Sequence, residues 1–300
     1  MESLKYFCFR LLLGFLKILP YNIQVSLIGG ILKVLLALSA KHQKYVYRNL
    51  ELVFPNKTKA EHQKIFVDST KTFGTLIADF LRMPEIDSDW IAKHVDSTEF
   101  EAAHKGETGT PVLYVSGHLG SFELLLHIIG MRAGGVHYIA RKLSPDFLDT
   151  WWNSLRKYAN NELIPRQGAL KKTLSLIKQG KSIGFLFDQN VKRTQAVFVP
   201  LFGRAAATTK TIAVSVLQTR IPVIVLVLKK IGDRYKVLAE RFEFDEIIDS
   251  DLTEDQKMQE ITLKVTQAFE RMLLEFPEGW FWMHRRWRTT PEGVPEDFYD

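Results

Sequence analysis

The hydrophobic and polar positions divide the chain into two regions of different pattern. Up to about residue 110 the apolar residues recur at helical spacing, and beyond it short apolar runs alternate with helical patterns. The apolar runs predict strands at 112–116, 136–140, 182–187, 223–228 and 235–239. The helical patterns predict helices at 122–131, 145–158, 169–178, 208–218 and 255–275. This alternation predicts an α/β fold with a mixed, largely parallel sheet flanked by helices.

The first forty residues are mostly apolar, but basic residues interrupt them. Their longest uncharged run, 18–32, is shorter than the ~20 apolar residues that a membrane-spanning helix needs. We therefore expect two amphipathic helices, at about 3–19 and 22–40, that lie in the cytoplasmic face of a bilayer. The segment 1–40 would associate with the membrane, and 41–300 would form one further domain. A signal peptide is less favoured because no small-residue cleavage pattern follows the first apolar run. In the alternative, the helices cover the core of a soluble protein.

His118 and Glu123 form the most informative polar pair. Residues five apart lie on different faces of a helix and on opposite sides of a strand, so the two side chains can meet only across a bend. The sequence predicts this bend between the strand 112–116 and a helix capped by Ser121. Glu123 would then lie in the first helical turn, where the helix dipole favours a carboxylate. We expect Glu123 to hold one imidazole nitrogen and to leave the other free as a base. Alternatively, the histidine only satisfies a loop carbonyl.

Further polar residues follow the predicted strands. Arg141 comes directly after the strand 136–140, and Asp188 and Gln189 come directly after 182–187. In α/β sheets the residues that bind ligands gather at the carboxyl ends of strands. We therefore expect these residues to share one site with His118 and to orient the hydroxyl, carbonyl or phosphate groups of a substrate. A solvated turn is the alternative for the basic residues that follow Gln189.

Two further segments are candidate anion sites. Gly203 and Arg204 precede small residues and the pair Thr208–Thr209, which we expect to cap the helix 208–218. Free N–H groups at such a helix end can hold a phosphate or a pantetheine chain. Arg166 precedes the helix 169–178 and is a further candidate ligand for an anion. The alternatives are a simple helix cap and a surface arginine.

Charge and composition limit the classes of partner. The net charge is +6 and the isoelectric point is about 9.2, which suits an anionic lipid surface, a phosphorylated substrate, an acidic carrier protein or a nucleic acid. The single cysteine, Cys8, excludes an intrachain disulfide and a cysteine-rich zinc site. The run 278–288 combines tryptophans with arginines, as membrane-interface proteins and nucleic-acid binders do, although part of it can pack in a core.

Motifs of several common enzyme classes are absent from the sequence. It contains no G-x-S-x-G, P-loop, G-x-G-x-x-G or H-E-x-x-H pattern, and its histidines have no metal-ligand spacing. A serine nucleophile, a bound nucleotide and a metal are therefore not expected.

Three motifs resemble those of one family. The run Ser116-Gly-His118-Leu-Gly-Ser-Phe-Glu123 resembles the His-x4-Asp/Glu motif of glycerolipid-type acyltransferases. The segments 188–204 and 277–287 resemble the lipid A biosynthesis late acyltransferases, the lauroyl/myristoyl transferases. The resemblance covers about residues 40–290. Family members usually begin with a clear spanning helix, whereas this N-terminus is interrupted and charged.

The resemblance implies a bacterial acyltransferase, with residues 41–300 as its catalytic domain, at the cytoplasmic face of the inner membrane. It implies transfer of an acyl chain from acyl carrier protein to a hydroxyl of a phosphorylated glycolipid, a lipid A precursor. His118 would be the general base, oriented by Glu123, while Arg141 and Asp188 would shape the site. No cofactor is expected beyond the acyl donor. The alternatives are a related acyltransferase with another acceptor, such as a lysophospholipid, and a non-catalytic protein that binds anionic membranes. Nucleic acid is not an expected partner.

Overall fold

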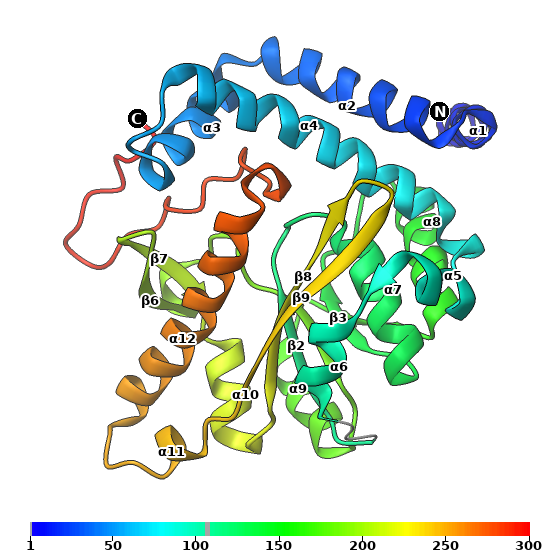
Figure 1. The fold of residues 1–300 in the computed structure, drawn as a ribbon. Helices are drawn as coiled ribbons and strands as arrows, with labels where there is room; N and C mark the ends of the chain where they lie inside the picture. Colours follow the sequence, from blue (N-terminus) through cyan, green and yellow to red (C-terminus); the bar gives the residue numbers. More distant parts are fainter. Residues whose placement is uncertain (1, 106–108) are drawn as a thin grey trace.

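A seven-stranded sheet with helices on both faces forms the centre of the computed structural model, which describes residues 2–105 and 109–300 (Figure 1). The strands are β1 (Val95–Asp96), β2 (Leu113–Ser116), β3 (His137–Ala140), β4 (Glu162–Pro165), β5 (Ile183–Leu186), β8 (Val223–Ile231) and β9 (Arg234–Phe242). Their order is β1-β9-β8-β2-β5-β3-β4, and only the β8–β9 pair is antiparallel. The expected mixed, largely parallel sheet is confirmed.

Twelve α-helices occupy the described residues. They are α1 (Glu2–Ile18), α2 (Tyr21–Ala37), α3 (Ala40–Val53), α4 (Lys59–Arg82), α5 (Ser88–His94), α6 (Thr98–His104), α7 (Phe122–Ala133), α8 (Asp146–Arg156), α9 (Ala169–Lys178), α10 (Thr211–Thr219), α11 (Asp245–Ile248) and α12 (Glu254–Glu275). Short 3-10 turns follow α4, α8 and α12. Figure 1 shows α2 and α4 side by side across one end of the sheet.

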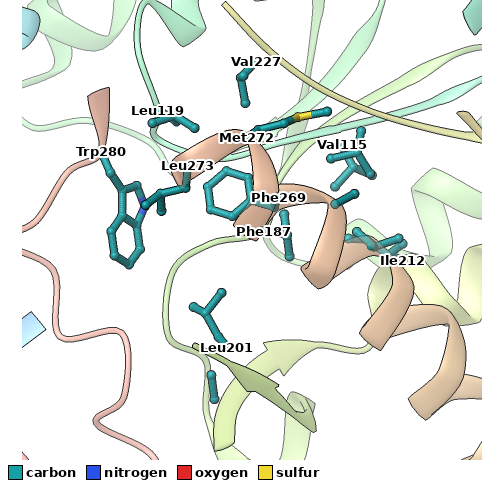
Figure 2. Packing of buried hydrophobic residues seen from close by; sticks show 14 of the residues in the cluster. Val115, Leu119, Phe187, Leu201, Ile212, Val227, Phe269, Met272, Leu273 and Trp280 are labelled. Carbon is teal, nitrogen blue, oxygen red and sulfur yellow. The ribbon is translucent and has the colours of Figure 1, made fainter. Parts of the chain in front are cut away.

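The alternation of side chains along the strands separates two hydrophobic cores. Leu113 and Val115 of β2 face a core that contains residues of α9, α10 and α12, and Figure 2 shows Phe269 of α12 at its centre. Tyr114 faces the other core, which contains residues of α5, α6 and α7. Because successive side chains of a strand point to opposite faces, β2 is buried on both sides. The loop after β2 therefore starts from a rigid position.

The small residues before α10 form a strand and not the predicted helix start. Residues of β6 (Ala196–Leu201) and β7 (Arg204–Thr209) pair as an antiparallel hairpin, so α10 begins only at Thr211. Hydrogen bonding to β6 and burial of Ala206 and Ala207 outweigh the local preference of alanine for helix. The predicted cap at Thr208–Thr209 is therefore wrong. Strand β4 was not predicted from the sequence either, and it pairs with β3.

Glycines bring the N-terminal helix α2 close to α4. A β-carbon on Gly74 would lie 2.3 Å from the carbonyl oxygen of Val25, and one on Gly29 would lie 2.8 Å from that of Thr70. Helix α1 contacts α8 through Phe9, whose ring centroid lies 5.1 Å from that of Trp151. Within the described residues, no single helix is long and apolar enough to cross a membrane, although α2 and α3, bent by 100°, pass the length and composition test as a pair.

Large apolar side chains of α1 and α2 are exposed. They are Leu4, Phe7, Leu11, Leu12, Phe15, Ile18, Ile23, Leu27, Ile31, Val34 and Leu35. The alternative in which these helices cover a soluble core predicts burial of such residues. The structure shows two helices whose bounds are close to the predicted ones, and many of their large apolar side chains are exposed.

The C-terminal aromatic and basic run lies in the core. Trp280, Trp282 and Trp287 are buried, and Arg286 is buried with hydrogen bonds from its guanidinium to Ala207 O and Thr208 Oγ1. The tryptophans therefore do not offer an interfacial or nucleic-acid-binding surface, and the core-packing alternative for this run is confirmed.

Candidate active site

The register of two neighbouring strands brings His118 and Asp188 together. Strands β2 and β5 pair in parallel with a constant offset, from Leu113 opposite Ile183 to Ser116 opposite Leu186. The same offset places His118 level with Asp188, two residues beyond the strand ends. The backbone N–H of His118 donates to Asp188 Oδ2 over 2.9 Å, and its Nδ1 lies 2.8 Å from Asp188 Oδ1.

The loop that carries His118 is fixed on several sides. The His118 carbonyl accepts a hydrogen bond from Phe281 N, and Gly120 N donates to Gly279 O. Gly120 has a φ of +64°, and a β-carbon there would lie 2.2 Å from Leu228 O. Only glycine adopts this conformation at no steric cost and allows that approach. Ser121 is the N-cap residue of α7 as predicted, but its hydroxyl donates to Asp79 and not to the helix end.

Asp188 is ionised and buried. Burial would raise the pKa of its carboxyl, but His118, the indole N–H of Trp280 and the backbone N–H of His118 lower it to about 2. The Trp280 Nε1 donates to Asp188 Oδ2 over 2.8 Å. An ionised carboxylate only accepts hydrogen bonds, so the Nδ1 of His118 must carry the proton.

The second nitrogen of His118 is therefore the basic atom of the neutral ring. Gln189 Nε2 lies 3.3 Å from His118 Nε2, where its amide N–H can donate to the lone pair. Burial would lower the pKa of His118, but Asp188 and, to a smaller extent, Glu123 outweigh it and raise that pKa above its ordinary value. This geometry is that of a general base held by a carboxylate.

Glu123 holds an arginine and not the histidine. Its Oε2 accepts from Arg156 Nε over 2.9 Å, and its Oε1 accepts from Arg156 Nη2 and, over 3.1 Å, from Trp152 Nε1. Both partners lie on α8. Because α7 begins at Phe122, the Glu123 side chain points towards α8. His118 lies in the preceding loop and points towards Asp188, beyond the end of β5. The predicted hydrogen bond between Glu123 and His118 is thus wrong, and Asp188 takes its place.

A cavity of about 790 Å³ opens in front of His118. Its lining includes His118, Glu123, Arg141, Arg166, Gln189 and Thr209 among the predicted site residues, and apolar side chains such as Tyr114, Leu126, Ile129, Tyr138 and Phe185. Asp188 is buried next to His118. The structure thus brings seven of the ten predicted residues to one place.

Three predicted residues lie elsewhere. Gly203 and Arg204 are at the turn of the β6–β7 hairpin, where the Arg204 guanidinium lies 4.3 Å from the ring centroid of Phe298. Thr208 is fully buried and accepts from Arg286 Nη2 over 2.6 Å. The hairpin therefore presents these residues away from the cavity, and the expected phosphate site at a helix end is not formed by them.

Sequence reasoning missed Trp152 and Arg156 as residues of this site. Both lie in the predicted helix 145–158, and both line the cavity. A buried carboxylate such as Glu123 needs a cation or several N–H donors, so a search for a cationic partner in a neighbouring helix could have found Arg156.

His284 is not a second base. Its Nε2 accepts from Asn190 N over 2.8 Å, and burial lowers its pKa to about 4, so its ring is neutral. Among residues 2–105 and 109–300, no cluster of three or more His, Cys, Asp and Glu side chains has metal-binding geometry.

Comparison with known proteins identifies relatives over almost the whole chain. A family model described as bacterial lipid A biosynthesis acyltransferase matches residues 2–289. A lipid A biosynthesis lauroyltransferase of Escherichia coli K12 is 27% identical over 292 residues, which cover 93% of this chain and 90% of that protein. A lipid A biosynthesis acyltransferase of Haemophilus influenzae is 25% identical over 258 residues, covering 84% and 79%. A lipid A biosynthesis palmitoleoyltransferase of Escherichia coli K12 is 21% identical over 282 residues, covering 92% and 88%.

Proposed function

Because the chain belongs to the bacterial lipid A biosynthesis acyltransferase family, we propose that it transfers a fatty acyl chain from acyl carrier protein to a hydroxyl of a lipid A precursor. One observation supports this proposal above the others. His118, with its Nδ1 held by the ionised carboxylate of Asp188, lines a large cavity that combines apolar walls with basic residues. The apolar walls suit an acyl chain, and the basic residues suit phosphate groups.

In the proposed reaction His118 Nε2 takes the proton of the acceptor hydroxyl. The oxygen then forms a bond to the thioester carbonyl carbon, and collapse of the tetrahedral intermediate breaks the carbon–sulfur bond. The leaving thiolate takes the proton back from the imidazolium. Asp188 stabilises the imidazolium in between, as a buried carboxylate does for a base of this kind. No covalent enzyme intermediate and no further cofactor is needed.

Other lining residues have proposed roles in binding. The tetrahedral oxyanion needs hydrogen-bond donors, and Arg141 is a candidate because it lines the cavity that His118 lines. Arg166, Gln189 and Thr209 would bind the polar parts of the two substrates. Glu123 would hold Arg156 and Trp152 in the cavity wall through hydrogen bonds. Its charge would also make a small contribution to raising the pKa of His118.

We also propose that the protein works at the cytoplasmic face of the inner membrane without crossing it. The exposed apolar side chains of α1 and α2, with Lys5, Arg10, Lys17 and Lys33 among them, have the character of interfacial helices. The net charge of +6 suits the two expected partners, an acidic carrier protein and a phosphorylated glycolipid.

The test combines lipid analysis with one substitution. Mass spectrometry of lipid A from cells with and without this protein should show the loss of one secondary acyl chain. In membranes supplied with labelled acyl donor, His118→Ala should retain no more than a few per cent of the transfer activity. His137→Ala is the matched control, since His137 is on β3 and pairs with Glu162.

Each alternative predicts a different result. An unchanged lipid A together with a labelled phospholipid would identify another acceptor. Equal vesicle binding by both proteins without any thioester consumption would identify a non-catalytic membrane protein. Normal transfer by His118→Ala would refute the assignment of the base.

A further inference from the structure

A second, smaller cavity lies between the N-terminal helices and the tip of the β8–β9 hairpin. Its volume is about 280 Å³, and residues of α2, α4, α5 and the hairpin line it. Figure 1 shows the hairpin tip reaching α4 at the end of the sheet where α2 crosses. Nothing in the proposed transfer reaction uses this cavity.

A buried carboxylate forms the base of this cavity. Asp79 Oδ1 accepts hydrogen bonds from Tyr21 and Tyr235, over 2.7 and 2.6 Å, and Oδ2 accepts one from Ser121. All three donors are hydroxyl groups. Asp79 therefore fixes the two tyrosines without forming an ion pair with a cation of the cavity.

Lys230 lies between these two tyrosines. Its Nζ donates to Tyr21 Oη over 2.9 Å and to Tyr235 Oη over 3.0 Å, and it lies 4.4 and 4.6 Å from the two ring centroids. An ammonium has three N–H donors, so one remains available. Within the described part of the chain Lys230 has no ion-pair partner.

A second cation, Arg82, also lies near the ring of Tyr21. The guanidinium of Arg82 lies 5.5 Å from the centroid of Tyr21, and its ion pair is a 3.5 Å contact with the exposed carboxylate of Glu85. Burial lowers the pKa of Lys230, the charges of Asp79 and Asp233 raise it, and the charge of Arg82 lowers it by the smallest amount. Asp233 also lines the cavity and is exposed, and its charge favours the ammonium form of Lys230. An anion in the cavity could contact Lys230, which has no ion-pair partner in the described residues, and Arg82, whose partner Glu85 is exposed.

We propose that this cavity binds a phosphate group, held by Lys230 and Arg82. A guanidinium and an ammonium that converge on one space form the pairing that binds phosphate oxygens well. The volume is many times the ~30 Å³ share of one water molecule, so a phosphate ester fits. Ile23 and Leu27, which are apolar and exposed, lie on the same helix α2 as the cavity residue Tyr21.

The test measures binding, so its outcome does not depend on acyl transfer. The full chain in neutral detergent and phosphate-free buffer is titrated by calorimetry with inorganic phosphate and, separately, with dihexanoylphosphatidic acid. Dihexanoylglycerol, which lacks only the phosphate, is the control ligand. We expect saturable binding to the wild-type protein that Lys230→Gln and Arg82→Gln each weaken about 10-fold or more, as the loss of one charged hydrogen bond predicts. The control Lys33→Gln, on the exposed face of α2, should bind as the wild type does.

The outcomes separate two sources of the phosphate. Tighter binding of the phosphatidic acid than of inorganic phosphate identifies a lipid headgroup, and equal binding identifies a site for free phosphate. Binding that Arg141→Gln abolishes and Lys230→Gln does not would place the phosphate in the larger cavity and overturn the proposal. No binding in either titration would overturn it as well. If Lys230→Gln alone lowers the melting temperature, the half-exposed Arg82→Gln decides the result.

Discussion

The two buried carboxylates of the candidate active site, Glu123 and Asp188, differ in how strongly their charges act on His118. Glu123 is paired with the guanidinium of Arg156, so its field at a distance is largely cancelled. Asp188 faces an imidazole that is neutral when it acts as a base, so its charge is uncompensated until a proton arrives. This explains why Asp188 raises the pKa of His118 more than Glu123 does. Asp188 is thus the residue with the larger effect on the basicity of His118, the proposed base.

Asp188→Asn should move the acidic limb of the pH profile. In the proposed reaction the base is neutral His118, whose pKa is raised above about 6.5, so kcat/KM should rise with pH through a limb above that value. Without the negative charge of Asp188, burial lowers the pKa of His118, so the limb moves to lower pH. Turnover should also fall at every pH because the imidazolium loses its stabilisation. A pH profile of kcat/KM for both proteins checks this, and an unmoved limb would show that Asp188 does not act on the base.

Glu123→Gln should mainly destabilise the protein. It leaves the guanidinium of Arg156 buried without its anion, and breaking a buried pair in this way costs about 3–5 kcal/mol. Thermal melting should therefore show a marked loss of stability. The double variant Glu123→Gln with Arg156→Met should recover much of it, because no buried charge remains. Wild-type stability of Glu123→Gln with a pH limb shifted as far as in Asp188→Asn would instead restore the role that the sequence suggested for Glu123.

At the scale of elements, local pattern predicted the strand, the loop and the helix around His118, but not the partner of His118. The bounds of β2 and α7 follow from the apolar run and from the glycines and serine between them. The pairing of β2 with β5 joins residues seventy positions apart, and no local signal encodes it. The sequence placed Asp188 at a strand end correctly, but only the strand order shows that this end adjoins His118. The direction of Glu123 depended on α8 and was equally non-local.

Gly117→Ala should disturb this loop through contacts that a β-carbon cannot avoid. The added atom would lie 2.4 Å from the ring of Phe269 and 2.9 Å from the carboxyl carbon of Asp188. Overpacking of a core costs about 1–3 kcal/mol, and a displaced Asp188 lowers activity as well. The control is Gly30→Ala on α2, where nothing lies within 4 Å of the new atom and helix propensity favours alanine. Melting and activity assays of both variants would contradict this view if Gly117→Ala behaved like Gly30→Ala.

At the scale of the whole molecule, the α/β layers were predictable from the sequence, whereas the β6–β7 hairpin and the burial of the C-terminal run were not. The β6–β7 hairpin and the buried C-terminal run are held by contacts with distant residues, such as Arg286 with Ala207. Tyr299 is buried and donates to Asn49 Oδ1 over 2.7 Å. By contrast, α1 and α2 were predictable because their apolar residues recur at helical spacing.

The exposed apolar side chains of α1 and α2 should decide whether the protein binds membranes. Phe7 and Leu11 are each 58% exposed, and burying such a side chain in a bilayer contributes about 1.5–3 kcal/mol. The double variant Phe7→Ser with Leu11→Ser should therefore lose at least about 100-fold in its affinity for anionic vesicles, measured by flotation. Leu252→Ser is the matched control, because Leu252 is also exposed and follows α11 in the sequence. Figure 1 shows α11 at the end of the molecule opposite α2. Transfer to a soluble, short-chain acceptor should survive in the double variant, since neither residue lines the active-site cavity. Equal flotation of both variants would show that α1 is not a membrane-binding element, and that another surface brings the cavity to its lipid substrate.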